Sequence, residues 1–299
     1  MAPPRYKLAR LSAIREIAEV RRIQGDEAAA LLAVGDLTVL DVRTPGEHAR
    51  LGHLPGSRLL PVDLVLSAPA VLPDDGRPLL VYCEHGVRSA HAAEVLAAAG
   101  LGPVYDLAGG MAAWRGAREF GASPVEGPAG WLLDNGDLLR PGMRVLDVAA
   151  GRGRHALLLA GAGLAVTAID RDAAKMTRLA DLAGRLGLAI TTEVRDLESG
   201  DAGLTEAAFD LIVVTNYLHR PLMPALVRAL APDGVLLYET FTTAQAARGK
   251  PTNPAFLLEP GELLRLVAPL EVIRQREGEV EGRMVASVVA VSGSRPASA

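Results

Sequence analysis

The stretch LLVYCEHGVRSA, residues 79–90, contains the features that decide the fold of the first half of the chain. Leu79–Tyr82 is an apolar run of strand length, and Cys83 opens a short loop that contains Gly86. The run Ser89–Ala99 then has the length and composition of a helix. A strand that enters a helix through such a loop is typical of an α/β domain.

Alternating strands and helices continue on both sides of this stretch. We expect further elements in the first half as follows: a helix over Asp26–Ala33, strands over Thr38–Val42 and Val104–Tyr105, and a helix after Gly109-Gly110. The segment 120–130 is rich in Gly and Pro, which is typical of a linker. The sequence therefore predicts a first domain over 12–119, a linker over 120–130 and a second domain over 131–292.

The α/β pattern restarts after the linker. Strands are predicted at Arg144–Val148, Ala165–Ile169, Ile190–Val194, Asp210–Val214 and Val235–Glu239, with helices between most of them. Alternation of this kind predicts a mostly parallel sheet with covered faces. Two β-rich runs, Glu271–Glu281 and Met284–Val291, flank Gly282 and predict a C-terminal antiparallel hairpin.

Composition places the chain among globular proteins. Of 299 residues, 49% are hydrophobic and 22% charged, and the formal net charge is −4. With the single cysteine, Cys83, no intrachain disulfide can form, which favours a reducing compartment. No apolar run reaches the ~18 residues that span a bilayer. We therefore expect a cytoplasmic protein without a membrane partner. The first 22 residues are locally basic, which predicts a solvated helix face and leaves RNA or membrane contact open.

The position of Cys83 gives its side chain a chemical role. Backbone N–H groups of the loop, the dipole of the following helix and the cation of Arg88 all favour the thiolate, which is the reactive form of cysteine. The same cradle would hold an anionic sulfur attached to Cys83 as a persulfide. We therefore predict Cys83 and Arg88 as catalytic residues rather than as core or surface residues.

The first 120 residues resemble the rhodanese family. The matching motifs are Leu40-Asp41-Val42-Arg43 with Glu47, Gly52-His53-Leu54-Pro55-Gly56, the loop from Cys83 to Arg88, and Leu107-Ala108-Gly109-Gly110-Met111-Ala112-Ala113-Trp114. The resemblance implies that Cys83 is the nucleophile and sulfur carrier, within a loop that also contains Glu84, His85, Gly86 and Val87. Asp41, Arg43 and Glu47 are expected to brace this loop, with Arg43 and Glu47 as an ion pair.

The length and charge of the loop constrain its ligand. Cys83 and Arg88 enclose four residues, which suits sulfur, whereas a related phosphatase group has a loop one residue longer. The carboxylate of Glu84 disfavours a dianionic donor through like-charge repulsion. We therefore expect a persulfide donor, on a protein or a small molecule, rather than thiosulfate.

In the second half, Val145-Leu146-Asp147-Val148-Ala149-Ala150-Gly151-Arg152-Gly153-Arg154-His155 is a strand, a glycine turn and a helix start. A dinucleotide site would favour a third glycine where Arg154 stands. With Asp170 and Asp196 after later strands, the pattern resembles class I S-adenosylmethionine-dependent methyltransferases, which implies a Rossmann-like fold and S-adenosylmethionine as cofactor. Asp147 and the glycines would surround the methionine part, Asp170 the ribose diol and Asp196 the adenine. The predicted cofactor-binding residues are Asp147, Ala149, Gly151, Gly153, Asp170, Arg171, Asp196, Leu197 and Asn216.

The segments from Phe209 to Leu222 and from Gly234 to Phe241 resemble the small tellurite-resistance type of methyltransferase within that superfamily. We expect a small methyl acceptor, because the domain lacks a large insertion on which a protein or a nucleic acid could dock. This acceptor would meet the methyl group near the loop from Asn216 to Arg220. The predicted acceptor-site residues are Tyr217, His219, Arg220 and Lys250. We predict no metal site.

The two resemblances together predict a bifunctional enzyme, a persulfide sulfurtransferase and a methyltransferase that acts on a thiol or another chalcogen acceptor. Two alternatives stay open. One is tRNA modification, although the lack of a wide basic stripe or aromatic platform disfavours a nucleic-acid partner. The other is a methyltransferase that a rhodanese unit regulates as a redox or sulfide sensor.

Overall fold

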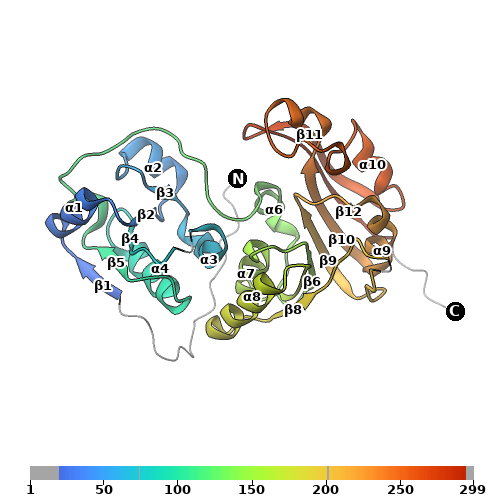
Figure 1. The fold of residues 1–299 in the computed structure, drawn as a ribbon, viewed down its shortest axis with the longest axis horizontal. Coiled ribbons are helices and arrows are strands. Elements are labelled where there is room, and N and C mark those ends of the chain that lie inside the picture. The colour runs from blue at the N-terminus through green and yellow to red at the C-terminus, as the bar shows by residue number, and fades with distance from the viewer. Residues whose placement is uncertain (1–19, 74, 201, 294–299) are drawn as a thin grey trace. The chain divides into compact units, whose positions relative to one another are not determined.

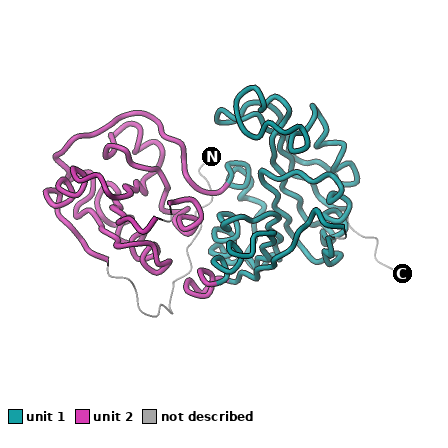
Figure 2. Tube along the Cα trace, in the orientation of Figure 1, with its two compact units in different colours: residues 1–4, 129–180, 189–299 teal, residues 5–128, 181–188 magenta. Residues whose placement is uncertain are grey.

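The structure is a computed structural model of the chain, and it describes residues 20–73, 75–200 and 202–293. The described chain divides into two compact units (Figure 2). The N-terminal unit comprises residues 20–128 with 181–188, and the C-terminal unit comprises residues 129–180 with 189–293. Each unit has its own sheet, and together they confirm the predicted two-domain α/β class. No helix in the described segments is both long and apolar enough to cross a membrane.

The N-terminal unit contains a five-stranded, all-parallel sheet in the order β1-β5-β4-β2-β3 (Figure 1). Its strands are β1 (Val20–Ile23), β2 (Thr38–Asp41), β3 (Arg58–Leu59), β4 (Leu79–Tyr82) and β5 (Val104–Leu107). Its helices are α1 (Gly25–Val34), α2 (Pro45–Leu51), α3 (Ala68–Val71), α4 (Val87–Ala98) and α5 (Gly110–Ala113), with a 3₁₀ segment η1 (Val62–Ser67). All four residues of β2 and of β4 are buried, as expected for central strands of a parallel sheet covered on both faces.

The elements predicted for this unit are present, and β4 has the predicted bounds. The structure adds the edge strands β1 and β3. The helix face predicted for the basic N-terminus is wrong at Arg21 and Arg22, which lie in β1 and pair with Tyr105 and Asp106 of β5. The remainder of that basic segment, residues 1–19, lies outside the described residues.

The C-terminal unit contains a seven-stranded sheet in the order β11-β12-β10-β9-β6-β7-β8. Its strands are β6 (Arg144–Val148), β7 (Ala165–Asp170), β8 (Ile190–Val194), β9 (Phe209–Thr215), β10 (Leu230–Phe241), β11 (Glu271–Val280) and β12 (Arg283–Val291). Its α-helices are α6 (Gly130–Asp134), α7 (Arg154–Gly161), α8 (Ala173–Leu186), which both units share, α9 (Met223–Ala229) and α10 (Glu262–Leu266). Its 3₁₀ segments are η2 (Gly136–Leu138), η3 (Arg220–Leu222), η4 (Thr243–Ala247) and η5 (Pro254–Phe256).

The sheet of this unit is parallel except at β12, which runs antiparallel to both β10 and β11. β11 and β12 form the predicted hairpin. Its two turn residues, Glu281 and Gly282, have φ values of 50° and 77°, which is the geometry of the two-residue turn that suits the twist of antiparallel strands. The carboxyl ends of β6, β7, β8 and β9 share one edge of the sheet, where ligands bind in open α/β folds.

Candidate active sites

The sulfur of Cys83 lies in a ring of amide hydrogens at the carboxyl end of β4. The backbone N–H of Gly86 donates to Sγ at 3.1 Å. Burial alone raises the pKa of the Cys83 thiol, but hydrogen bonds outweigh burial and bring the pKa below its ordinary value. These bonds come from the Ser89 hydroxyl and from the backbone N–H groups of Ser89, His85 and Gly86. The cradle predicted from the sequence is therefore present, and it stabilises the thiolate.

Glycines shape this cradle. Gly86 has a φ of 81°, which favours glycine, and it is the residue immediately before α4. On the other side of the loop, a Cβ on Gly110 would lie 2.3 Å from the Cys83 carbonyl oxygen. That carbonyl accepts from Met111 N–H at 2.9 Å, and the Glu84 carbonyl accepts from Ala112 N–H at 2.9 Å. Because the first turn of α5 takes up the carbonyl groups, the N–H groups of the loop are free to face the sulfur.

Access to the sulfur is narrow. Cys83 is only 1% exposed, whereas Val87, which begins α4 directly after the loop, is 77% exposed. The reacting atom thus lies at the bottom of its loop and not on the surface, so a donor must present a small sulfur group to reach it.

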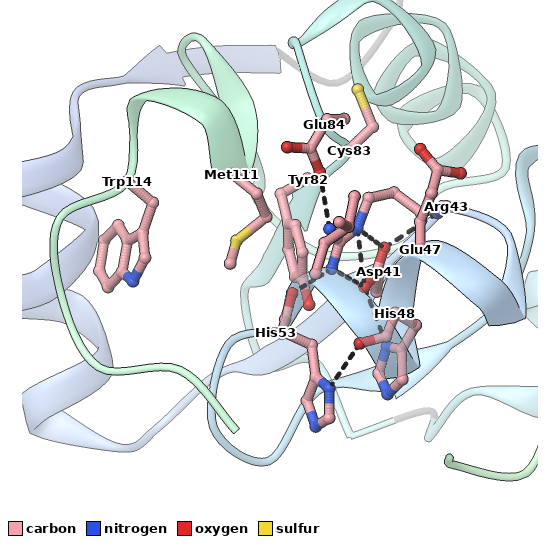
Figure 3. Close-up of polar contacts among 12 residues, drawn as sticks. Asp41, Arg43, Glu47, His48, His53, Tyr82, Cys83, Glu84, Met111 and Trp114 are labelled. Atoms are coloured by element: carbon pink, nitrogen blue, oxygen red, sulfur yellow. Dashed lines mark hydrogen bonds and ion pairs between the residues drawn. The ribbon is translucent and has the colours of Figure 1, made fainter. Parts of the chain in front are cut away.

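Arg43 and Glu47 brace the loop, but not as the predicted pair (Figure 3). The fully buried Arg43 binds both carboxylate oxygens of Asp41 and donates to Glu84 Oε2 at 2.7 Å. Glu47 instead forms its ion pair with Arg88 and caps α2 through Thr44. The predicted Arg43–Glu47 ion pair is therefore wrong. Asp41 ends β2, directly beside β4, so its carboxylate reaches Arg43 first.

A second set of polar contacts extends this brace toward the segment after Trp114. His48 Nδ1 lies 2.9 Å from Asp41 Oδ2, and His48 Nε2 lies 2.9 Å from Ser123 Oγ. The ring of His53 stacks on His48 with centroids 3.7 Å apart. Residues from three separate stretches of sequence therefore hold Asp41, and through it Arg43, in one orientation.

Sequence reasoning missed a buried pair of polar side chains that joins α4 to β5. Ser89 and Asp106 are both buried, and Ser89 Oγ lies 2.6 Å from Asp106 Oδ1. Asp106 comes from β5, the neighbour of β4 in the sheet. Its only local signal is a carboxylate at the end of a predicted strand, which does not reveal the contact with a serine 17 positions away.

The second site is a cavity of about 310 Å³ at the carboxyl edge of the C-terminal sheet. Six of the predicted cofactor residues line it: Ala149, Asp170, Arg171, Asp196, Leu197 and Asn216. Ala149 and Asn216 have φ values of 52° and 56°, a strained backbone that clusters at ligand sites.

Asp170 fits the role of a hydroxyl acceptor. Its two oxygens accept one backbone N–H each, from Gly151 at 2.8 Å and from Asp172 at 2.9 Å. An ionised carboxylate has about four acceptor positions, so two remain for a ligand. Asp196 is exposed and lines the same cavity from the loop after β8. Two carboxylates in one cavity, one of them held by the glycine turn through the Gly151 N–H, fit a nucleoside with a ribose diol.

Three predicted cofactor residues do not line this cavity. Asp147 is 1% exposed, accepts from Ala156 N–H at 3.1 Å and lies 3.8 Å from His155 Nδ1. Gly153 precedes α7, and a Cβ there would approach Leu179 to 2.5 Å. Gly151 is connected to the cavity only through its hydrogen bond to Asp170.

The predicted acceptor residues are dispersed. Tyr217 lines the cavity, while His219 lines a separate cavity of about 210 Å³. Arg220 makes an ion pair with Glu262 and also donates to backbone carbonyls of η5 and the residue after it. Lys250 is exposed and is absent from the residues that line the cavity. The lining residues that sequence reasoning missed are Arg195, Glu198, Leu218, Phe241, Pro251 and Phe256.

Both halves of the chain match known protein families. Residues 24–117 match the rhodanese-like domain family, and residues 145–234 match a methyltransferase domain family. The thiosulfate sulfurtransferase GlpE of Ectopseudomonas mendocina is 39% identical over 103 residues, which cover 33% of this chain and 88% of that protein. The protein-L-isoaspartate O-methyltransferase of Methylorubrum populi is 43% identical over 100 residues, which cover 33% of this chain but only 45% of that protein.

Among solved structures, TehB from Haemophilus influenzae aligns with a TM-score of 0.48 and 22% identity, over 55% of this chain and 62% of that one. The methyltransferase match supports S-adenosylmethionine as the cofactor of the C-terminal unit.

Proposed function

Because the chain belongs to the rhodanese-like family through residues 24–117 and has a methyltransferase domain over residues 145–234, we propose that it is a bifunctional enzyme of sulfur chemistry. In this proposal Cys83 carries sulfane sulfur, and the C-terminal unit methylates a small thiol or other chalcogen acceptor. In this proposal the rhodanese-like domain extends over residues 12–119 and the methyltransferase domain over residues 131–292, joined by the linker 120–130.

The sulfur step uses the thiolate of Cys83 as the nucleophile. It attacks the outer sulfur of a persulfide, RS–SH, so that the donor S–S bond breaks, a new S–S bond forms on Cys83, and RS⁻ leaves. Transfer to a second thiolate reverses these changes and regenerates the Cys83 thiolate. The amide hydrogens around Sγ stabilise the anionic sulfur before and after each transfer.

The charges around the loop support a persulfide donor over thiosulfate. Arg43 is paired with Asp41 and Glu84, Arg88 with Glu47, and Arg22 with Asp106. Each of these three arginines already faces a carboxylate, so a dianion would gain little from them. The 1% exposure of Cys83 also favours a donor with a small terminal sulfur.

The methyl step needs alignment more than acid–base help. When bound, S-adenosylmethionine supplies an activated methyl group that passes to the acceptor nucleophile. Asp170 would hold the ribose diol and Asp196 the adenine amino group, with Ala149, Arg171, Leu197 and Asn216 around them. Gly151 would orient Asp170 through its N–H.

The observation that carries the acceptor proposal is the aromatic wall of the cavity. Tyr217, Phe241 and Phe256 line the same space as Asp170 and Asp196. Such a wall favours a small, polarizable acceptor of low charge, which describes a thiol better than a phosphate or carboxylate. Since Arg220 is occupied by Glu262, it serves this wall by holding η5 rather than by attracting an anion.

A methyl-transfer screen tests this function. Radiolabelled S-adenosylmethionine is incubated with thiols of similar size and different charge: an alkyl thiol, mercaptoacetate and cysteamine, each with and without a persulfide donor. We expect label in the alkyl thiol first. An Asp170→Asn variant should lose cofactor binding by tenfold or more. Asp210→Asn is the matched control, because Asp210 pairs with Arg144 at the opposite ends of the strands. Equal cofactor affinity in both variants would refute the cofactor assignment.

The link between the two units has its own test. If sulfur carried by Cys83 reaches the methyl acceptor, a Cys83→Ser variant should lose the donor-dependent part of methyl transfer and keep the part measured with free thiols. Unchanged donor-dependent product from this variant would exclude the link while leaving both separate activities in place.

A further inference from the structure

A row of polar side chains crosses one face of the C-terminal sheet. Glu239 of β10 pairs in register with Thr215 of β9 on one side and with Ser287 of β12 on the other. Ser287 pairs in turn with Arg276 of β11. Side chains at paired positions of neighbouring strands point to the same face of a sheet. The four side chains therefore meet on one face, and Glu239, in the middle of the row, is 0% exposed.

Only one oxygen of the Glu239 carboxylate is satisfied. Oε2 accepts from Ser287 Oγ at 2.7 Å and from Arg276 Nη2 at 2.9 Å. Among the residues that the structure describes, Oε1 of Glu239 has no hydrogen-bond partner, and neither has Oγ1 of Thr215, which is 9% exposed. A buried polar atom without a partner is costly, so folded proteins rarely keep two of them at paired positions. Two such oxygens indicate a ligand that brings N–H or O–H donors.

These two oxygens belong to residues beside the cofactor cavity. Thr215 directly precedes Asn216, which lines the cavity. Glu239 lies on the same face of β10 as Phe241, another lining residue, because positions two apart on a strand share a face. Each residue advances a strand by about 3.3 Å, so Thr215 and Glu239 lie within about 7 Å of these lining residues along their strands. A ligand that extends from the cavity can reach both.

The order of the strands matches the order of the parts of S-adenosylmethionine. Asp196 follows β8, Asp170 ends β7, and the glycine turn follows β6. β9 and β10 come next in the sheet, with Thr215 and Glu239. In the proposed placement the adenine lies at Asp196 and the ribose at Asp170, so the methionine part extends toward β9 and β10. Asp147, the acid that the sequence predicts for the methionine part, is 1% exposed and does not line the cavity.

We propose that Glu239 Oε1 and Thr215 Oγ1 accept hydrogen bonds from the α-ammonium of the cofactor, and that Arg283 pairs with its α-carboxylate. The methionine end is a zwitterion, and these residues offer it both charges. Arg283 Nη2 lies 3.8 Å from Glu239 Oε1 and 4.0 Å from Glu281 Oε2, both longer than a hydrogen bond. Since a guanidinium has five N–H donors, Arg283 keeps donors for a ligand carboxylate. This assignment rests on the proposed placement of the adenosine part.

Binding of three ligands, measured by isothermal titration calorimetry, tests the assignment. S-adenosylhomocysteine carries the whole amino-acid end, its decarboxylated analogue keeps only the amine, and 5′-methylthioadenosine has neither group. Glu239→Gln should weaken binding of the first two ligands about tenfold or more and leave 5′-methylthioadenosine unchanged, because it removes the acceptor of a charged donor. Thr215→Val should weaken the same two ligands several-fold. Arg283→Met should weaken S-adenosylhomocysteine several-fold and spare the decarboxylated analogue.

Two controls make the same chemical changes elsewhere in the sheet: Asp210→Asn at the amino end of β9 and Thr167→Val in the middle of β7. Both should leave all three affinities unchanged. If Glu239→Gln weakens all three ligands equally, or none of them, the proposal is overturned, because a purely structural role does not distinguish the ligands. Wild-type protein that binds none of the three overturns the cofactor site as well, so the two failures are distinguishable. If Glu239→Gln does not fold, Thr215→Val and Arg283→Met decide: wild-type ratios of the three affinities in both variants contradict the assignment.

Discussion

Replacing Arg43 by methionine should destabilise the N-terminal unit more than any surface arginine does. The guanidinium is fully buried, binds Asp41 at 2.8–3.1 Å, and donates to the Gly52 carbonyl and to Glu84 at 2.7 Å each. Asp41 is itself 0% exposed, so removing Arg43 leaves a buried carboxylate with His48 as its main side-chain partner. Breaking one side of a buried pair costs about 3–5 kcal/mol.

Urea denaturation followed by circular dichroism measures this cost. A loss of about 3–5 kcal/mol is a large part of the roughly 5–15 kcal/mol that stabilises a domain. Arg43→Lys should lose less, because it keeps the charge but not the planar fork. Asp41→Asn in the Arg43→Met background should recover part of the loss by removing the unpaired charge. Arg58→Met, at a half-exposed pair with Glu126, is the matched control. Equal destabilisation by Arg43→Met and Arg58→Met would refute this account of the brace.

Three further predictions follow from single contacts. The hydrogen bond from Arg88 lowers the pKa of Glu47 from 4.5 to about 2. A carboxyl group with a lowered pKa stabilises the folded state above pH 4.5, and this stabilisation is lost as the pH falls toward 2. In urea denaturation at a series of pH values, the difference in stability between wild type and Glu47→Gln should therefore close over that interval. Gly151→Ala should lower the free energy of unfolding by about 1–2 kcal/mol, the cost of the positive φ alone, because no heavy atom lies within 4 Å of its Cβ position. Gly153→Ala adds a 2.5 Å approach to Leu179 and should lower it by about 1–3 kcal/mol more. Similar melting temperatures for the two variants would contradict this. Arg220→Met should release η5 and raise the KM for an alkyl thiol several-fold with little change in cofactor affinity. As the control, Arg248→Met, which removes an exposed pair with Glu279, should leave the KM and the cofactor affinity unchanged.

Much of the architecture could be predicted because it follows from local rules. The strand bounds at Leu79–Tyr82, Arg144–Val148 and Ile190–Val194 agree with apolar runs between turn residues. The short strands β1 and β3 were missed. Each forms by pairing with a strand distant in the sequence, β1 with β5 and β3 with β2. The residues of the short strand itself therefore show no periodicity that predicts it.

What the amino-acid sequence determined by itself is the chemistry that depends on neighbours along the chain: a cysteine in a glycine loop before a helix, and acids that end successive strands. Backbone N–H groups and helix dipoles act over a few residues, so a short motif is enough to specify them. Tertiary structure alone decided which charged side chains meet. Arg43 binds Asp41 and Glu84 rather than Glu47, Asp106 reaches Ser89, and Arg220 turns to Glu262, because sheet order and register set these distances, and spacing in the sequence does not.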